Sequence, residues 1–261
     1  MMGIGFGQYY PASSFVHRID PRVKIIVVIA LVMTLLFVTR WIGLGIAAAG
    51  IIFAIWFSQV PLSFYLRSLR LIFYIVAFAM LINIFLTPGD TVLFSLGFIR
   101  VTTEGIFRAL LMASRLILLV AVSSLLTLTT SHIKLTDGIE ALLRPTPLPA
   151  HDIAMMMTIA LRMIPTLAEE TEKIMKAQKA RGTDFGGNPV KRVRSFLPIL
   201  VPLFISSFKR ADDLATAMEA RCYRGGANRT KLSPLQMHVT DWAVLIISAL
   251  FCTGLILTRF L

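Results

Sequence analysis

The sequence predicts an all-α, polytopic membrane protein with about five transmembrane helices and a cytoplasmic block of about three coupling helices. Two observations lead to this fold class. Hydrophobic residues make up 56% of the 261 residues and charged residues only 15%, with a mean hydropathy of +0.77. The apolar residues also gather in runs of about 17–22 that lack the periodicity of a one-sided helix, as expected of bilayer-spanning helices.

The charges are concentrated in one polar segment. Residues 131–241 hold sixteen of the 26 Lys and Arg and eleven of the 14 Asp and Glu. This mixed-sign surface has no basic stripe with interleaved aromatic residues, so the formal charge of +12 does not predict nucleic-acid binding. Basic loops are typical of the cytoplasmic side of a membrane protein, which places the N-terminus and the polar segment in the cytoplasm. No cleavable signal peptide is expected, because a basic n-region followed by an apolar h-region is missing.

Four apolar helices are predicted before the polar segment. Asp20-Pro21 is an N-cap followed by a first helical residue, and it starts a helix over 22–39. A second helix, 41–57, is rich in Gly and Ala, which favours close helix packing, either within the chain or with a partner. Pro61, Arg67 and Arg70 indicate a loop before a third helix, 71–87, which ends in a turn at 87–90.

Residues 92–101, which Gly97 interrupts, form either a short hairpin or an extended loop. The fourth helix begins after a cap-like cluster at 102–105 and continues to residue 130. It places Arg115 two or three turns inside, where the side chain either reaches the interface or pairs within the bundle.

The polar segment predicts three further helices. A short amphipathic helix, 134–143, precedes prolines at alternate positions from 145 to 149, which force extended backbone. A long helix over 151–181 should be kinked at Pro165, and another over 190–221 at Pro198 and Pro202. A last apolar helix, 242–257, follows a polar linker. The predicted domains are therefore a membrane domain (1–130), a cytoplasmic coupling-helix domain (131–240) and a C-terminal transmembrane helix (241–261).

Catalytic and metal-binding motifs are not found, so no catalytic residues, metal ligands or cofactor are expected. Two acidic pairs, Glu169-Glu170 and Asp212-Asp213, are surrounded by basic residues and are interpreted as solvated ion pairs rather than catalytic carboxylates. Cys222 lies in the polar segment and Cys252 in an apolar run, so a disulfide is not predicted. The membrane helices also lack the chains of acids and histidines that would mark an ion path.

The two long polar helices end on similar signatures, Ala180-Arg181-Gly182 and Ala220-Arg221-Cys222, and a glycine pair follows each one. One such end would be an ordinary helix terminus, since small residues and arginine are favoured there. Two ends forty residues apart instead suggest equivalent contacts with a pair of similar partners, because a guanidinium can meet carboxylates in a groove. A methionine cluster that includes Met155 to Met157 and Met163 is either an adaptable binding surface or plain packing.

These motifs together resemble a known family. The sequence Tyr10-Pro11, the run from His17 to Lys24, the run from Ala160 to Leu167 and the paired Ala-Arg-small ends are similar to the transmembrane T component of energy-coupling factor (ECF) transporters. One departure is Cys222, where the second motif usually has glycine. We expect the contact to survive there with somewhat altered helix-end geometry.

The resemblance implies the partners and the mechanism. Two ABC-type ATPase subunits, identical or different, would receive the two arginine-bearing ends, and an S component that binds a vitamin or a metal would lie on the long helices. The expected S-component contacts are Met156, Met157, Met163 and Pro165. ATP-driven movement of the ATPases would then reach the S component through this chain, in the cell membrane of a prokaryote.

Two other function classes remain open at this point. A membrane-embedded enzyme would use the acidic pairs, although the sequence offers no nucleophile or metal set for it. An autonomous substrate-binding receptor would need buried polar residues within the spans, for which Asn83 and Arg115 are the candidates.

Overall fold

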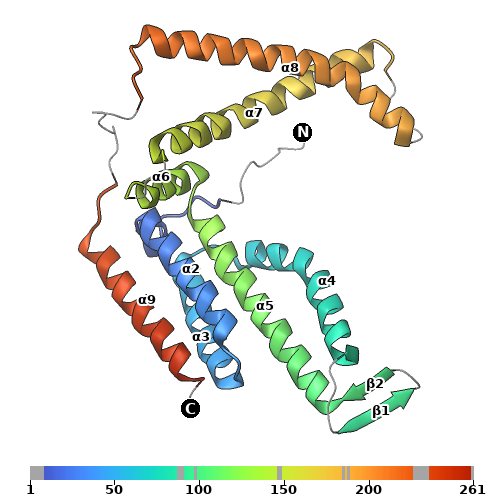
Figure 1. Ribbon diagram of the computed structural model, residues 1–261, viewed down its shortest axis with the longest axis vertical. Coiled ribbons are helices and arrows are strands. Elements are labelled where there is room, and N and C mark those ends of the chain that lie inside the picture. The colour runs from blue at the N-terminus through green and yellow to red at the C-terminus, as the bar shows by residue number, and fades with distance from the viewer. Residues whose placement is uncertain are drawn as a thin grey trace. The chain divides into compact units, whose positions relative to one another are not determined.

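Helices form most of the computed structural model, which describes residues 9–86, 91–96, 99–145, 149–183, 186, 189–225 and 235–259 (Figure 1). The turn predicted at 87–90, Gly97, Pro147, the second glycine of each pair (Gly187 and Gly226) and most of the polar linker lie outside these residues. In chain order the elements are α1 (Phe15–Arg18), α2 (Pro21–Phe37), α3 (Trp41–Ser58), α4 (Leu62–Leu86), β1 (Val92–Leu96), β2 (Ile99–Thr102), α5 (Thr103–Thr129), α6 (His132–Leu143), α7 (Ala150–Ala180), α8 (Pro189–Ala220) and α9 (Val239–Leu257).

The predicted class, an all-α membrane protein, is confirmed. Among the described residues, α3, α5 and α9 are each long and apolar enough to cross a bilayer. The 17-residue α2 and the segment Ile72–Phe85 of α4 are further apolar helices. The two short strands pair antiparallel, with Leu96 opposite Ile99, so the hairpin alternative for residues 92–101 is the one observed.

The loop predicted around Pro61, Arg67 and Arg70 is wrong, because α4 already begins at Leu62. Arginine is a good helix former, and a charge in an apolar sequence does not by itself interrupt a helix. The break lies earlier, at Gln59, which adopts a left-handed conformation with φ of 55° and ends α3.

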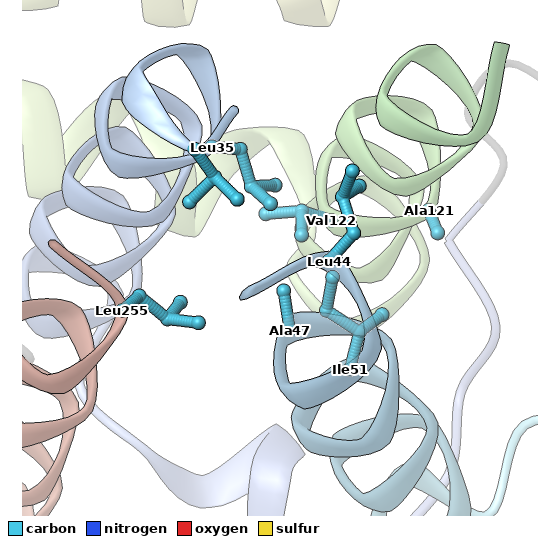
Figure 2. Packing of buried hydrophobic residues seen from close by; sticks show 8 residues of the cluster. Leu35, Leu44, Ala47, Ile51, Ala121, Val122 and Leu255 are labelled. Atoms are coloured by element: carbon cyan, nitrogen blue, oxygen red, sulfur yellow. The ribbon is translucent and has the colours of Figure 1, made fainter. Parts of the chain in front are cut away.

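The chain divides into two compact units, Met1–Gly138 with Pro234–Leu261 and Ile139–Ser233. The core of the first unit lies where α2, α3, α5 and α9 meet (Figure 2). Its buried residues are Leu35, Val38, Leu44, Ala47, Ile51, Ala121, Val122 and Leu255. Many other large apolar residues of this unit stay exposed, as expected of helices that face lipid.

Glycines of α3 allow its neighbours to approach closely. A Cβ atom at Gly50 would lie 2.5 Å from Cζ of Phe251 in α9, and one at Gly43 would lie 2.6 Å from Oγ1 of Thr258. Both distances are too short for a side chain. At these two positions the small residues therefore serve packing within the chain.

Polar contacts join the ends of four segments in the first unit. Asp241 is 1% exposed and accepts hydrogen bonds from the backbone N–H of Asp20 at 2.9 Å and of His238 at 2.8 Å. Lys24 donates to the carbonyl oxygen of Thr129 at 3.1 Å, and so neutralises part of the negative C-terminal end of α5. The N-terminal arm, α2, α5 and α9 are thus fixed to one another at this end.

Arg115 is partly buried and contacts the backbone at the end of a neighbouring helix. Its Nη2 donates to the carbonyl oxygen of Val38, the C-cap of α2. The position that looked deep within a helix is therefore level with the end of the neighbouring helix, and the guanidinium satisfies a carbonyl group that the end of α2 leaves without an intrahelical donor.

Candidate functional site

The C-terminal end of α7 is closed by a left-handed glycine. Gly182 has a φ of 85°, its N–H donates to the carbonyl oxygen of Lys179 at 3.0 Å, and the N–H of Thr183 donates to Gln178 at 3.0 Å. This pair of bonds is the Schellman motif, which satisfies the last carbonyl groups of a helix. It leaves Arg181 as the C-cap residue, with its side chain exposed.

The end of α8 has the same geometry. Cys222 has a φ of 55°, its N–H donates to Glu219 at 2.8 Å, and the N–H of Tyr223 donates to Met218 at 3.0 Å. The φ of Cys222 is smaller than that of Gly182, while the two hydrogen bonds of the Schellman motif are present at both ends. Cysteine carries the steric cost of a left-handed residue that glycine avoids.

The two arginines are presented alike. Arg181 and Arg221 each immediately precede the left-handed residue, and both are exposed, as are Gly182 and Cys222. A guanidinium at a helix C-terminus is favoured by the helix dipole and presents its donors outward in a planar fork. Each end can therefore offer several hydrogen bonds to one carboxylate-bearing groove.

The helices that carry the two ends run antiparallel within the second unit (Figure 1). Gln178 near the end of α7 contacts Pro198 near the start of α8, with 3.5 Å between the amide nitrogen and the carbonyl oxygen. Tyr223, just past α8, instead contacts His151 at the start of α7. The arginine-bearing ends therefore lie at opposite ends of α7, up to roughly 45 Å apart for a straight helix of this length.

The second end is held by a contact with the start of α7. The hydroxyl group of Tyr223 lies 3.3 Å from Nε2 of His151, and the two rings lie nearly parallel. Nδ1 of His151 lies 3.6 Å from Oε1 of Glu140 in α6. The tip that bears Arg221 is thus connected through His151 to the helix that precedes α7.

An ion pair joins α7 and α8 between these two contacts. Arg210 donates to Oε2 of Glu170 at 2.7 Å, and Ser206 donates to its other oxygen. The hydrogen bond from Ser206 and the nearby Arg210 hold the pKa of the Glu170 carboxyl below its usual value. Glu170 is therefore an ionised partner in packing, in line with the interpretation of the acidic pairs as ion pairs.

The four predicted S-component contacts do not share one face. Met156 is 63% exposed, and Met163, seven residues later, lies on the same side of α7. Met157 is offset by about 100°, and Pro165 lies on the side opposite Met156. Met156 and Met163 therefore share one side of α7, whereas Met157 and Pro165, about 80° apart, lie toward the other side.

A larger apolar surface lies on α8 and was missed by the sequence analysis. Its members follow the helical repeat and are each 44–69% exposed: Leu197, Leu200, Val201, Phe204 and Phe208. Ser206 and Arg210, which contact α7, lie on the opposite side of α8. The spacing of these five residues is visible in the sequence, where the two prolines of this segment predict only a bend. We call this set the α8 apolar stripe.

Comparison with known proteins identifies the family. A family model described as CbiQ, cobalt transport protein, matches residues 12–232. The energy-coupling factor transporter transmembrane protein EcfT of Thermosediminibacter oceani is 49% identical over 265 residues and 100% of both chains. The EcfT proteins of Ruminiclostridium cellulolyticum (48%, 98% of this chain and 97% of the relative) and Listeria innocua (45%, 92% of each) are also similar. The chain therefore belongs to the CbiQ family, among the transmembrane proteins of energy-coupling factor transporters.

Proposed function

We propose that this chain is the non-catalytic membrane subunit that transmits movement from two ABC-type ATPases to a substrate-binding S component in an ECF importer. The observation that carries the proposal is the repeated helix end: two exposed arginines, each followed by a left-handed residue and by the same pair of Schellman hydrogen bonds. Equivalent ends on one chain fit two equivalent or closely similar partners. The named EcfT relatives support a place in a transporter complex.

The antiparallel arrangement suggests how movement would be transmitted. Each ATPase would receive one end, Ala180 to Gly182 or Ala220 to Cys222, through carboxylates that meet the guanidinium. Because the ends lie at opposite ends of the α7–α8 pair, closure of the ATPases on ATP would change the angle between these helices. The Glu170–Arg210 pair, which joins the two helices between their ends, would act as the pivot.

The S component would rest on the α8 apolar stripe together with Met156. Exposed apolar residues at helical spacing are the pattern with which one helix packs against another apolar surface. This assignment retains Met156 from the four residues expected from the sequence and adds the α8 apolar stripe. In the same proposal residues 131–240 are the cytoplasmic coupling domain, residues 1–130 and 241–261 lie in the membrane, and the N-terminus is cytoplasmic, following the basic residues.

Charge reversal at the two ends tests the proposal. The chain would be co-expressed with the ABC ATPases of its host and purified as wild type, Arg181→Glu, Arg221→Glu and the double variant. We expect each single change to weaken ATPase recovery and the double change to abolish it. Lys209→Glu is the control, since it reverses an exposed charge on α8 twelve residues before Arg221. Full ATPase recovery with the double variant would show that the two ends are ordinary helix termini.

A further inference from the structure

An apolar cavity of about 410 Å³ lies inside the first unit, between α1, α2, α3, α5 and α9. Its walls include Val27, Leu31, Phe53, Leu125, Ile247 and Phe251. Phe53 and Ile247 are themselves 59% and 66% exposed, so the cavity opens sideways between α3 and α9. Ser248, one of the few polar residues in the wall, donates its hydroxyl to the carbonyl oxygen of Leu245.

The cavity runs lengthwise along the helices. At one end it is lined by Lys24 and Thr129, which are hydrogen-bonded to each other, and at the other by Leu31 and Val122. Seven residues of α2 separate these ends, which corresponds to about 10 Å of helix. One leaflet of a bilayer has a hydrocarbon core about 15 Å thick, so the cavity follows most of that thickness.

Basic residues surround the end of the cavity at Lys24. Arg18 is exposed and adjoins Ile19, which lines the cavity. Lys134 is exposed, and it lies close enough to Lys24 for the two positive charges to repel each other. Two acids at this end, Asp20 and Asp241, are buried and accept backbone hydrogen bonds, and a third, Asp137, is partly exposed and is outnumbered by Arg18 and Lys134. The accessible charge at the mouth is therefore positive.

We propose that this cavity is a binding site for one acyl chain of an anionic phospholipid, whose phosphate group lies at the basic mouth beside Arg18 and Lys134. An apolar lining offers water few hydrogen-bond partners, and the open side of the cavity lies among exposed apolar residues that would face lipid. An empty cavity would forfeit the dispersion contacts of all its lining atoms. An acyl chain matches the apolar lining, the lengthwise shape and the sideways opening, and the basic mouth favours an anionic headgroup.

The test uses the assembled transporter in nanodiscs that contain a phosphatidylglycerol with a photoactivatable group on its acyl chain. After irradiation, mass spectrometry would locate the lipid adduct. We expect adducts on peptides from α3, α5 and α9 at cavity positions. Adducts with phosphatidylglycerol should exceed those with an otherwise identical phosphatidylcholine probe.

Two substitutions on different helices would fill the cavity, Ala54→Phe in α3 and Ser248→Phe in α9. Each should lower the adduct about tenfold, the factor expected from losing roughly two buried methylene groups. Their matched controls are Ala49→Phe and Ala249→Phe, which add the same ring at exposed positions of the same helices outside the cavity wall. Arg18→Gln with Lys134→Gln should remove the preference for phosphatidylglycerol and leave the acyl adduct in place.

Three results would overturn the proposal. Adducts spread evenly over exposed helix faces would show that only bulk lipid contacts the chain. Adducts that persist in both filled variants would place the lipid elsewhere. Protection of the cavity residues from the lipid probe by a neighbouring membrane protein would show that a helix of a partner occupies the cavity. If one filled variant does not assemble, the other variant and the wild-type adduct map still decide the outcome.

Discussion

Replacing Cys222 by glycine should tighten the end of α8. Cys222 has a φ of 55°, in the region that costs a side-chain-bearing residue about 1 kcal/mol more than glycine. Hydrogen exchange at the amides of Cys222 and Tyr223 reports this end directly, since both donate to carbonyl groups of the last turn. A gain near 1 kcal/mol would slow exchange about fivefold if these amides exchange by local opening of the helix end.

Three further variants separate backbone conformation from cysteine chemistry. Cys222→Ala keeps the left-handed cost and should leave exchange unchanged, whereas Ala220→Gly lies in the right-handed helix and should accelerate exchange. Gly182→Ala places a Cβ atom on a residue with a φ of 85°, so it should accelerate exchange at Thr183 about fivefold or more. If Cys222→Gly accelerates exchange as Ala220→Gly does, the left-handed assignment of the second end is refuted.

Three other predictions concern the contacts around the bundle. Burial lowers the pKa of His17 below its ordinary value near 6.5. As the pH drops below about 6.5, the His17 imidazole therefore takes up a proton more readily in the unfolded chain, and the free energy of unfolding should fall. His17→Gln should flatten this part of the pH profile of thermal unfolding. Asp241→Ala removes the acceptor of the buried backbone N–H of Asp20 and of the part-buried N–H of His238. It should lower the free energy of unfolding by about 2–4 kcal/mol, visible as a lower melting temperature, whereas Asp213→Ala at an exposed position should have little effect. Tyr223→Phe removes the hydroxyl contact to His151 and should increase the mobility of a spin label on Cys222, measured from the line shape of its electron paramagnetic resonance spectrum. An unchanged line shape would show that this contact does not hold the second end.

The elements that the sequence predicted well have strong local signals. The Asp20-Pro21 start of α2 is observed, with the Asp20 carboxylate accepting from the N–H of Arg22, because a cap depends only on neighbouring residues. The bounds of α7 and α8 lie within one or two residues of the prediction for the same reason. The late start assigned to the third helix failed because basic residues were taken as a loop signal, although arginine is compatible with a helix.

The remaining features depend on contacts between residues distant in sequence. The role of Arg115 follows from the position of Val38, which no local pattern reveals. The buried Asp241 likewise acquires its role from Asp20, 221 residues earlier in the chain. The equivalence of the two arginine-bearing ends was predicted from their sequence, whereas their separation at opposite ends of α7 required the contacts of Tyr223 and Gln178.

The central claim, that the two helix ends contact ATPases, can be tested through a native cysteine. Cys222 is exposed beside Arg221, while Cys252, the other cysteine of the chain, is buried. A photoreactive maleimide attached to Cys222 in the assembled transporter should yield an adduct with an ATPase subunit upon irradiation. Cys222→Ser should lose the adduct, and Thr183→Cys in that background should restore one from the other end. Adducts with lipid or with the S component alone would contradict the coupling function.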